Sequence, residues 1–130
     1  MLRTAFLVDG FNLYHSLVEA QHALQGRGTR WLDLRSLCAS FLPHIDTAAR
    51  LGPAVLVTGD SDITPGVRCA LRLFPEIPAY ACFPYNRQSL ELKAASSGAL
   101  RITKEAYARH QFSDPIVLPG GRSIRKPVHW

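Results

Sequence analysis

The chain has 130 residues, enough for one domain with one hydrophobic core. Its composition, 47% hydrophobic and 19% charged, is that of an ordinary soluble globular protein. No apolar run approaches the roughly 20 residues that span a bilayer, and the N-terminal run meets Asp9 too early for a signal peptide. We therefore expect a cytoplasmic protein without a membrane partner.

The net charge of +5 favours polyanionic partners, nucleic acid first. Most of the acidic charge that looks functional falls in two short motifs, which suits a metal-dependent enzyme acting on a phosphate backbone. The three cysteines, Cys38, Cys69 and Cys82, are odd in number and match no zinc-binding spacing. We expect them to be buried, reduced thiols.

The first half of the chain contains one apolar run and two helical patterns. Residues 4–8 predict a buried parallel strand, followed by a turn at Asp9 and Gly10. Apolar residues at helical spacing predict a helix over residues 11–25. A second helix is expected after Asp33, its N-cap, and ends at Pro43.

The second half alternates strands with helices. Residues 54–58 predict the second buried strand, and a helix with Thr64 as its N-cap is expected to run to about Phe74. The remaining predicted elements are a strand over 79–83, a helix over 89–97, a strand over 99–102 and a helical turn from 103 to 107. Such alternation predicts a three-layer α/β/α fold with a small, mostly parallel sheet of about four strands.

The C-terminal segment differs from the rest. Residues 115–130 contain two short β-like runs around Pro119-Gly120-Gly121, which predicts a hairpin or an extended arm. We therefore divide the chain into a domain over residues 1–112 and an arm over residues 113–130. The basic residues of the arm either contact nucleic acid or are simply solvated.

Three carboxylates follow the first two predicted strands. Asp9 ends the first strand, and Asp60 and Asp62 follow the second. Ligands of open α/β sheets bind outside the carboxyl ends of the strands, so neighbouring strands would bring these acids together. Crowded carboxylates need a cation, and oxygen ligands favour Mg²⁺ or Mn²⁺. We expect all three to be catalytic metal ligands, although each motif alone also fits an Asx turn or a helix cap.

Polar residues beside these acids are further candidates. The amide of Asn12 is suited to binding substrate or positioning a metal-bound water, and equally to capping the first helix. The hydroxyls of Thr58 and Ser61 are suited to donating hydrogen bonds to a phosphate, although strand-end hydroxyls need no such role.

The loop after the third strand is expected on the same rim. Arg87 is suited to bidentate phosphate contact, and Ser89 would lie at a helix N-terminus, which favours anions. The ring of Tyr85 is suited to stacking on a base. The alternative is a solvated loop with a capping serine.

Two segments, Val8-Asp9-Gly10-Phe11-Asn12-Leu13-Tyr14 and Val57-Thr58-Gly59-Asp60-Ser61-Asp62, resemble the NYN domain of the PIN-like nuclease superfamily, in its LabA-like branch. The resemblance implies a divalent-metal ribonuclease acting on RNA. It also implies that Asp9, Asp60 and Asp62 are metal ligands and that Asn12 is a supporting polar group.

The chain departs from that family between the second helix and the second motif. Family members carry further strands and another acidic residue there, whereas residues 44–53 alone fill the space and contain only Asp46. The resemblance therefore implies a shortened domain that lacks one acid. Its first strand becomes a sheet edge, for which we expect cover by a homodimer, with or without exchanged elements.

Two alternatives to an active ribonuclease remain open. One is a catalytically impaired NYN-fold module for RNA binding or dimerisation, favoured by the missing acid. The other is a haloacid-dehalogenase-like phosphatase, which also places an aspartate after its first strand. Such enzymes normally have a second aspartate two residues later, where this chain has Phe11.

Overall fold

The computed structural model describes residues 3–45 and 52–130. The sheet strands are β1 (Ala5–Val8), β2 (Ala54–Val57), β3 (Ala79–Phe83) and β4 (Gly98–Arg101). The helices are α1 (Gly10–Ala23), α2 (Leu34–Phe41), α3 (Thr64–Leu73), α4 (Leu90–Ala95) and α5 (Lys104–Arg109), with 3₁₀ turns η1 (Leu42–His44) and η2 (Ser61–Ile63). A small hairpin, β5 (Ile116–Val117) and β6 (Ser123–Ile124), follows them.

The four strands form one all-parallel sheet in the order β1-β2-β3-β4. Val8 lies opposite Val57, and Val57 lies opposite Cys82, so the first three strands end at one rim. Strands of this kind are short apolar runs because both faces of a parallel sheet are covered. The predicted small α/β fold with a four-stranded parallel sheet is confirmed, and β1 lies at an edge of it.

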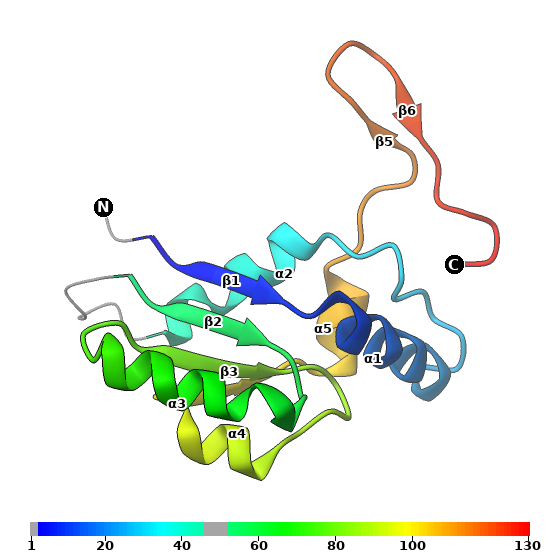
Figure 1. The fold of residues 1–130 in the computed structure, drawn as a ribbon. Helices are drawn as coiled ribbons and strands as arrows, with labels where there is room; N and C mark the ends of the chain where they lie inside the picture. Colours follow the sequence, from blue (N-terminus) through cyan, green and yellow to red (C-terminus); the bar gives the residue numbers. More distant parts are fainter. Residues whose placement is uncertain (1–2, 46–51) are drawn as a thin grey trace.

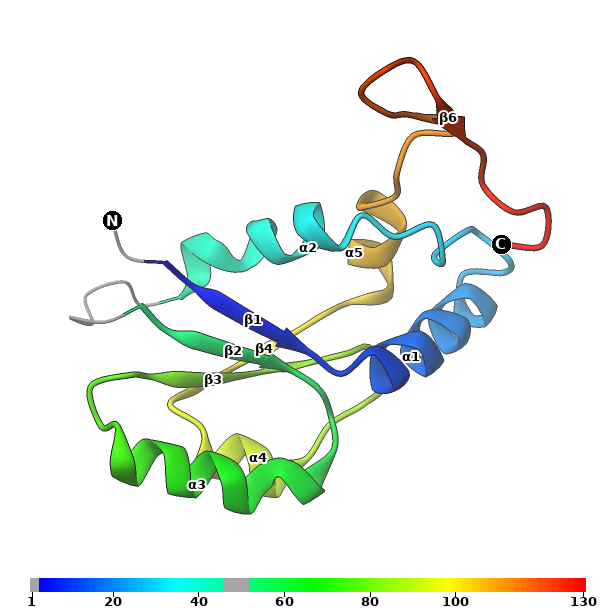
Figure 2. The same ribbon diagram turned by 45° about the horizontal axis from the view of Figure 1, so that its top comes forward.

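Helices cover both faces of the sheet, and each face has its own core (Figures 1 and 2). On one face, Val55 and Val57 of β2 pack with residues of α1, α2 and α5, among them Leu17 and the fully buried Tyr107. On the other face, Leu56 packs with residues of β3, α3 and α4. The alternation of neighbouring β2 residues between two cores follows from the two-residue period of a strand.

The connections on either side of β2 have opposite hands. From β1 to β2 and from β2 to β3 the chain steps in the same direction across the sheet. The first connection passes through α1 and α2 on one face, and the second passes through α3 on the other (Figure 2). The β2-α3-β3 connection is the usual right-handed one, so the β1-to-β2 connection is left-handed, which is rare between parallel strands.

Helix capping agrees with the sequence at two places and differs at a third. The Asp33 carboxylate accepts the Ser36 amide at 3.0 Å, and the Ser89 hydroxyl accepts the Leu92 amide at 3.1 Å, as N-caps do. The prediction for Thr64 is wrong, because Thr64 is already the first residue of α3. The turn η2 runs directly into this helix, and the capping carboxylate lies before η2, on Asp60.

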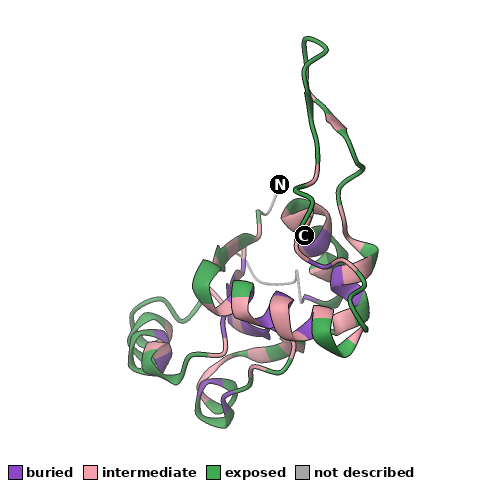
Figure 3. Cartoon of the chain, turned by 90° about the vertical axis from the view of Figure 1, so that its right-hand side faces the viewer, coloured by how far each residue is buried: buried purple, intermediate pink, exposed green. Residues whose placement is uncertain are grey.

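The segment after α5 forms the expected hairpin, which stands away from the sheet and is mostly exposed (Figures 1 and 3). Rings of Phe112 and Trp130 contact the ring of Trp31, each with a centroid distance of 6.1 Å, and so tie both ends of the segment to the body. Within the described residues, no helix combines the length and apolar character needed to cross a bilayer.

The cysteines are free thiols, as expected, but they are not all buried. Cys82 lies inside the sheet, where burial raises its pKa to about 12, and Cys38 is half-buried. Cys69 is exposed, which corrects the expectation, because its side chain lies on the solvent face of α3 and not among the apolar residues around it in sequence.

We expect β1 to be the least stable strand of the sheet. It pairs on one side only, and the longest connection of the sheet joins it to its neighbour, so loop closure costs more for β1 than for β4, the other edge. In native-state hydrogen exchange, the Leu7 amide should therefore open at a lower denaturant concentration than amides of β4 and of the central strand β3. Equal opening free energies for β1 and β4 would contradict this expectation.

Candidate functional site

Asp9 lies where β1 gives way to α1, and both of its carboxylate oxygens are held. It is the N-cap of α1, and its Oδ1 accepts the Asn12 amide at 3.0 Å. Its Oδ2 accepts the hydroxyl of Thr58, from the end of β2, at 3.1 Å. The structural role that the sequence suggested for this aspartate is therefore real, and the second hydrogen bond also directs the carboxylate toward β2.

Thr58 links Asp9 to Asp60. Its side chain is buried, and its Oγ1 accepts the backbone amide of Asp60 at 3.1 Å while donating to Asp9. Asp60 in turn caps η2, with Oδ1 accepting the Asp62 amide at 3.0 Å. Thr58 is thus a connecting group between two acidic loops, and its hydroxyl has no proton left to donate to a phosphate.

Asp9 and Asp60 line the same open pocket of about 400 Å³ at the carboxyl rim of β1 and β2. The other residues that line it are Leu7, Val8, Leu56, Thr58 and Ile63. Asp62 and Ser61 are exposed and lie outside this lining. The structure therefore brings two of the three predicted carboxylates together, and leaves the third at the outer side of the loop.

Among the described residues, no cation forms an ion pair with these acids. In the part of the chain that the structure describes, the only ion pairs join Arg68 to Glu91 and Arg87 to Glu19. Neither Asp9 nor Asp60 is in an ion pair there. Two carboxylates that share a pocket without a basic partner favour a bound cation.

The donor set fits a hard cation only in part. Within residues 3–45 and 52–130, no three His, Cys, Asp or Glu side chains gather closely enough to hold a metal ion. The carboxylates of Asp9 and Asp60 each keep acceptor capacity beyond their hydrogen bonds. Mg²⁺ is commonly bound by one or two carboxylates and completes its shell with waters and substrate phosphates, so two acids suffice for it. Asp46 lies outside the described residues.

Asn12 does not cap α1, because Asp9 does. Its amide oxygen accepts the backbone N–H of Gly59 at 3.0 Å, which joins the first turn of α1 to the loop that carries Asp60. The side chain therefore holds two loops of the pocket in register.

Gly59 is where the β2 and β3 loops touch. A Cβ atom on Gly59 would lie 2.7 Å from the Arg87 Cβ and 2.9 Å from the Arg87 carbonyl carbon, closer than real contacts allow. Only glycine fits this close approach. The sequence motif shows Gly59 before Asp60. The reason for a glycine there is the close approach of Arg87, which belongs to a loop far away in the sequence.

Arg87 turns toward α1 and not toward the carboxylates. Its guanidinium is paired with the Glu19 carboxylate, which also accepts the Asn86 side-chain amide at 2.7 Å. The hydrogen bond from Asn86 and the charge of Arg87 lower the pKa of Glu19. Glu19 was not singled out in the sequence, and nothing local marks it, because its partner lies 68 residues away. The proposed phosphate contact of Arg87 would need this pair to open.

The other candidates of this loop have structural roles. Ser89 is buried and caps α4, which is the role that the sequence offered as the alternative to phosphate binding. The Tyr85 backbone is held by two side chains: Ser16 donates to its carbonyl at 2.6 Å, and its amide donates to the Tyr107 hydroxyl at 3.2 Å. Burial raises the pKa of Tyr107 to about 12.

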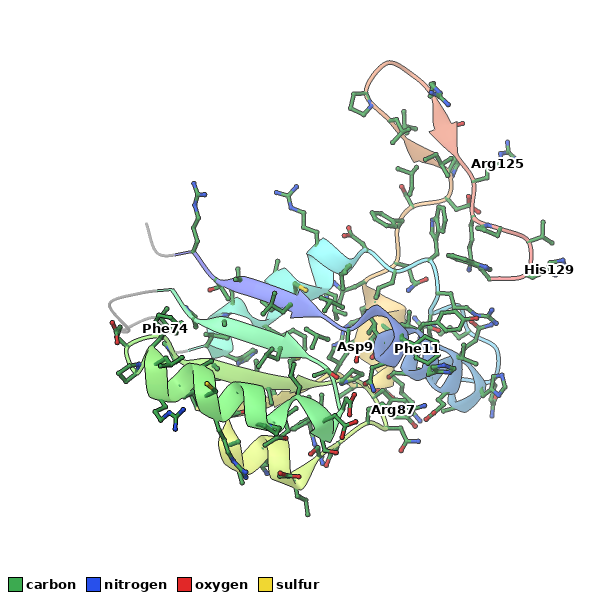
Figure 4. The ribbon with its side chains drawn as sticks, in the orientation of Figure 1. Asp9, Phe11, Phe74, Arg87, Arg125 and His129 are labelled. Atoms are coloured by element: carbon green, nitrogen blue, oxygen red, sulfur yellow. The ribbon has the colours of Figure 1, made fainter. Side chains whose placement is uncertain are left out.

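A second pocket, of about 330 Å³, opens at the carboxyl ends of β3 and β4. Tyr85 lines it together with the cationic residues Arg101 and Lys104. These two cations were not predicted as site residues. Their positions in the sequence could have indicated them, because they flank the end of the fourth strand, on the rim where the acids were expected. Arg125 and His129 of the arm lie well away from Asp9 (Figure 4).

Comparisons of the chain with models of protein families, with curated proteins and with solved structures find no match. The two sequence motifs and the geometry of the pocket therefore carry the functional argument.

We predict that Gly59→Ala disturbs the pocket by separating two loops. The added Cβ must displace the Arg87 backbone, so the free energy of unfolding should fall by about 1–3 kcal/mol. Urea denaturation measures this change.

Gly66→Ala is the matched control for that substitution. Nothing lies within 4 Å of a Cβ on Gly66, which belongs to α3, so alanine should stabilise the helix by roughly 0.5–1 kcal/mol. Equal effects of the two substitutions would show that Gly59 is not sterically constrained.

Proposed function

We propose that this chain is an NYN-type, PIN-like ribonuclease in which Asp9 and Asp60 hold Mg²⁺ or Mn²⁺ against a phosphate of RNA. One observation carries the proposal: Asp9 and Asp60, from neighbouring parallel strands, line one pocket without a basic partner in the described chain. The rim at the carboxyl ends of parallel strands is also where α/β proteins bind their ligands.

The division of labour follows from the contacts. Asp9 and Asp60 are the proposed metal ligands, and Thr58 and Asn12 are positioning residues that hold their loops together. Asp62 does not line the pocket, so it is not one of the proposed direct ligands of the metal. A divalent ion bound here would polarise the phosphate and favour attack by water. Hydrolysis adds water across a P–O bond and leaves one phosphate end and one hydroxyl end.

The charge distribution supports a nucleic-acid substrate. The net charge of the chain is +5. Asp9 and Asp60 of the pocket nevertheless have no ion-pair partner among the described residues. Arg101 and Lys104 line the second pocket of the same rim, where they are suited to contacting further phosphates of the strand. The three free thiols fit a reducing compartment, and the proposal includes the cytoplasm as the place of action.

One observation favours a second candidate function, an RNA-binding module that does not cleave. The described residues offer two pocket carboxylates and no cluster of three ligands. A site with two acids binds a cation more weakly than one with three. The two candidates are separated by activity and not by binding.

We predict a graded loss of activity when the acids are replaced one at a time. Asp9→Asn and Asp60→Asn should each lower Mn²⁺-dependent cleavage about 100-fold or more, because each removes a proposed ligand. Asp62→Asn should lower it less than about tenfold, because Asp62 does not line the pocket. The substrate is a hairpin RNA with paired and unpaired regions, and circular dichroism checks that each variant is folded.

Three outcomes distinguish the candidates. Equal cleavage by wild type and Asp60→Asn would remove the ribonuclease. Binding of the hairpin without cleavage in Mg²⁺ or Mn²⁺ would select the binding module. Hydrolysis of p-nitrophenyl phosphate that is abolished by Asp9→Asn would select the phosphatase instead.

We further propose that the β1 edge is covered by a second copy of the chain. β1 pairs on one side only, and its Leu7 side chain is 58% exposed beside the pocket. An uncovered edge strand with apolar side chains is a template for pairing with another chain, and two-fold dimers are the commonest way to close such a surface.

A charge on this edge should dissociate the dimer. Leu7→Lys places a cation where two edges would meet, so the mass measured by light scattering should fall from two chains to one. Leu73→Lys is the control, because Leu73 is 61% exposed at the end of α3, away from β1. A wild-type mass of one chain at all concentrations would end the dimer proposal and leave the nuclease proposal untouched.

A further inference from the structure

Three rings lie together on the first turns of α1, directly after Asp9. The ring centroids of Phe11 and His15 are 4.5 Å apart with planes at 72°, and those of Tyr14 and His15 are 5.7 Å apart at 69°. Residues three and four apart on a helix share one face, so Phe11 aligns with both of its neighbours. We call these three residues the α1 aromatic cluster.

The cluster is turned outward, away from the core that α1 helps to form. Phe11 is 77% exposed and Tyr14 is 47% exposed, whereas Leu13 and Leu17 of the same helix are buried. Burying a phenylalanine side chain stabilises a protein by roughly 1.5–3 kcal/mol, and Phe11 forgoes most of this gain. Single exposed apolar residues are common. Here the Phe11 ring contacts the His15 ring, and the His15 ring also contacts the Tyr14 ring.

The location of the cluster relates it to the acids. Phe11 lies two residues after Asp9, whose carboxylate lines the pocket, and both residues belong to the start of α1 (Figure 4). Leu7, which lines the pocket, supplies a further exposed apolar side chain. A phosphate held at Asp9 and Asp60 would therefore bind beside the helix turn that carries the Phe11 ring.

We propose that Phe11, Tyr14 and His15 form a stacking platform for an unpaired base, so that the substrate of the neighbouring site is single-stranded RNA. The inference rests on the proposed ribonuclease function and adds its substrate class. Bases stack on exposed aromatic side chains without regard to sequence, and only an unpaired base offers a free face. In a duplex the faces are occupied by neighbouring base pairs. The platform therefore selects single-stranded over double-stranded RNA and does not select a base sequence.

Binding without catalysis tests the platform separately from the nuclease. The probe is a fluorescein-labelled ten-nucleotide oligouridine, and fluorescence anisotropy in EDTA gives its Kd. Phe11→Ala should raise the Kd roughly 5- to 100-fold, the range for loss of one stacked base. Phe11→Tyr should retain wild-type affinity. Phe74→Ala should also retain it, because Phe74 is 54% exposed beyond the end of α3, away from the cluster.

A spectroscopic signal distinguishes stacking from mere proximity. A base that stacks on Phe11→Trp should quench the fluorescence of the new indole, and Phe74→Trp should show no quenching above the background of the two native tryptophans. A duplex of the same length should bind more weakly than the single strand. Because Phe11 is exposed, its variants should melt at the wild-type temperature, which thermal denaturation checks.

The outcomes separate the two proposals. Unchanged Kd values for Phe11→Ala overturn the platform even if Asp9→Asn abolishes cleavage, and the nuclease then stands alone. Equal or tighter binding of the duplex also overturns it. If Phe11→Ala changes the mass in light scattering and not the Kd, the cluster is a protein interface and the platform is wrong. Stacking that persists while Asp60→Asn cleaves as wild type keeps the platform and removes the nuclease.

Discussion

The hydroxyl of Thr58 is the link on which the arrangement of the acidic rim depends. It donates to the Asp9 carboxylate and accepts the Asp60 amide, so one buried side chain ties two acids from neighbouring strands. These two hydrogen bonds hold the loops in place against the mutual repulsion of the two carboxylates. The Asn12 contact with Gly59 and the close fit of Gly59 against Arg87 extend the same link to α1 and the β3 loop.

The surroundings of this link keep the acids free of counterions. Arg87 is the cation that the sequence predicted on the same rim as the acids. It is paired with Glu19 on α1, and Asn86 also donates a hydrogen bond to Glu19. Arg101 and Lys104 line a different pocket, and Arg125 and His129 of the arm lie away from Asp9 (Figure 4). Within the described residues the acidic pocket of this basic protein therefore has no ion-pair partner of its own.

The sequence predicted the elements and the parallel sheet, since these follow from apolar periodicity. That the strands before Asp9 and Asp60 are neighbours was a condition of the predicted site, and the sheet order meets it. It did not predict which polar groups would be used structurally. Ser89 and Arg87 look like anion ligands locally, but a cap and a distant glutamate engage them. Such pairings depend on contacts tens of residues apart. The exposure of Phe11 was also not predicted, because the motif does not distinguish it from Leu13, which is buried on the same helix.

The left-handed connection between β1 and β2 has a consequence for biogenesis. Asp9 emerges early in synthesis, but it meets Thr58 and Asp60 only when the longest connection of the sheet has closed. The later strands β2, β3 and β4 are joined by shorter, helix-bearing segments and can assemble without β1. In a nascent or partly opened chain the two acids are therefore separated, and the acidic pocket exists only in the finished fold.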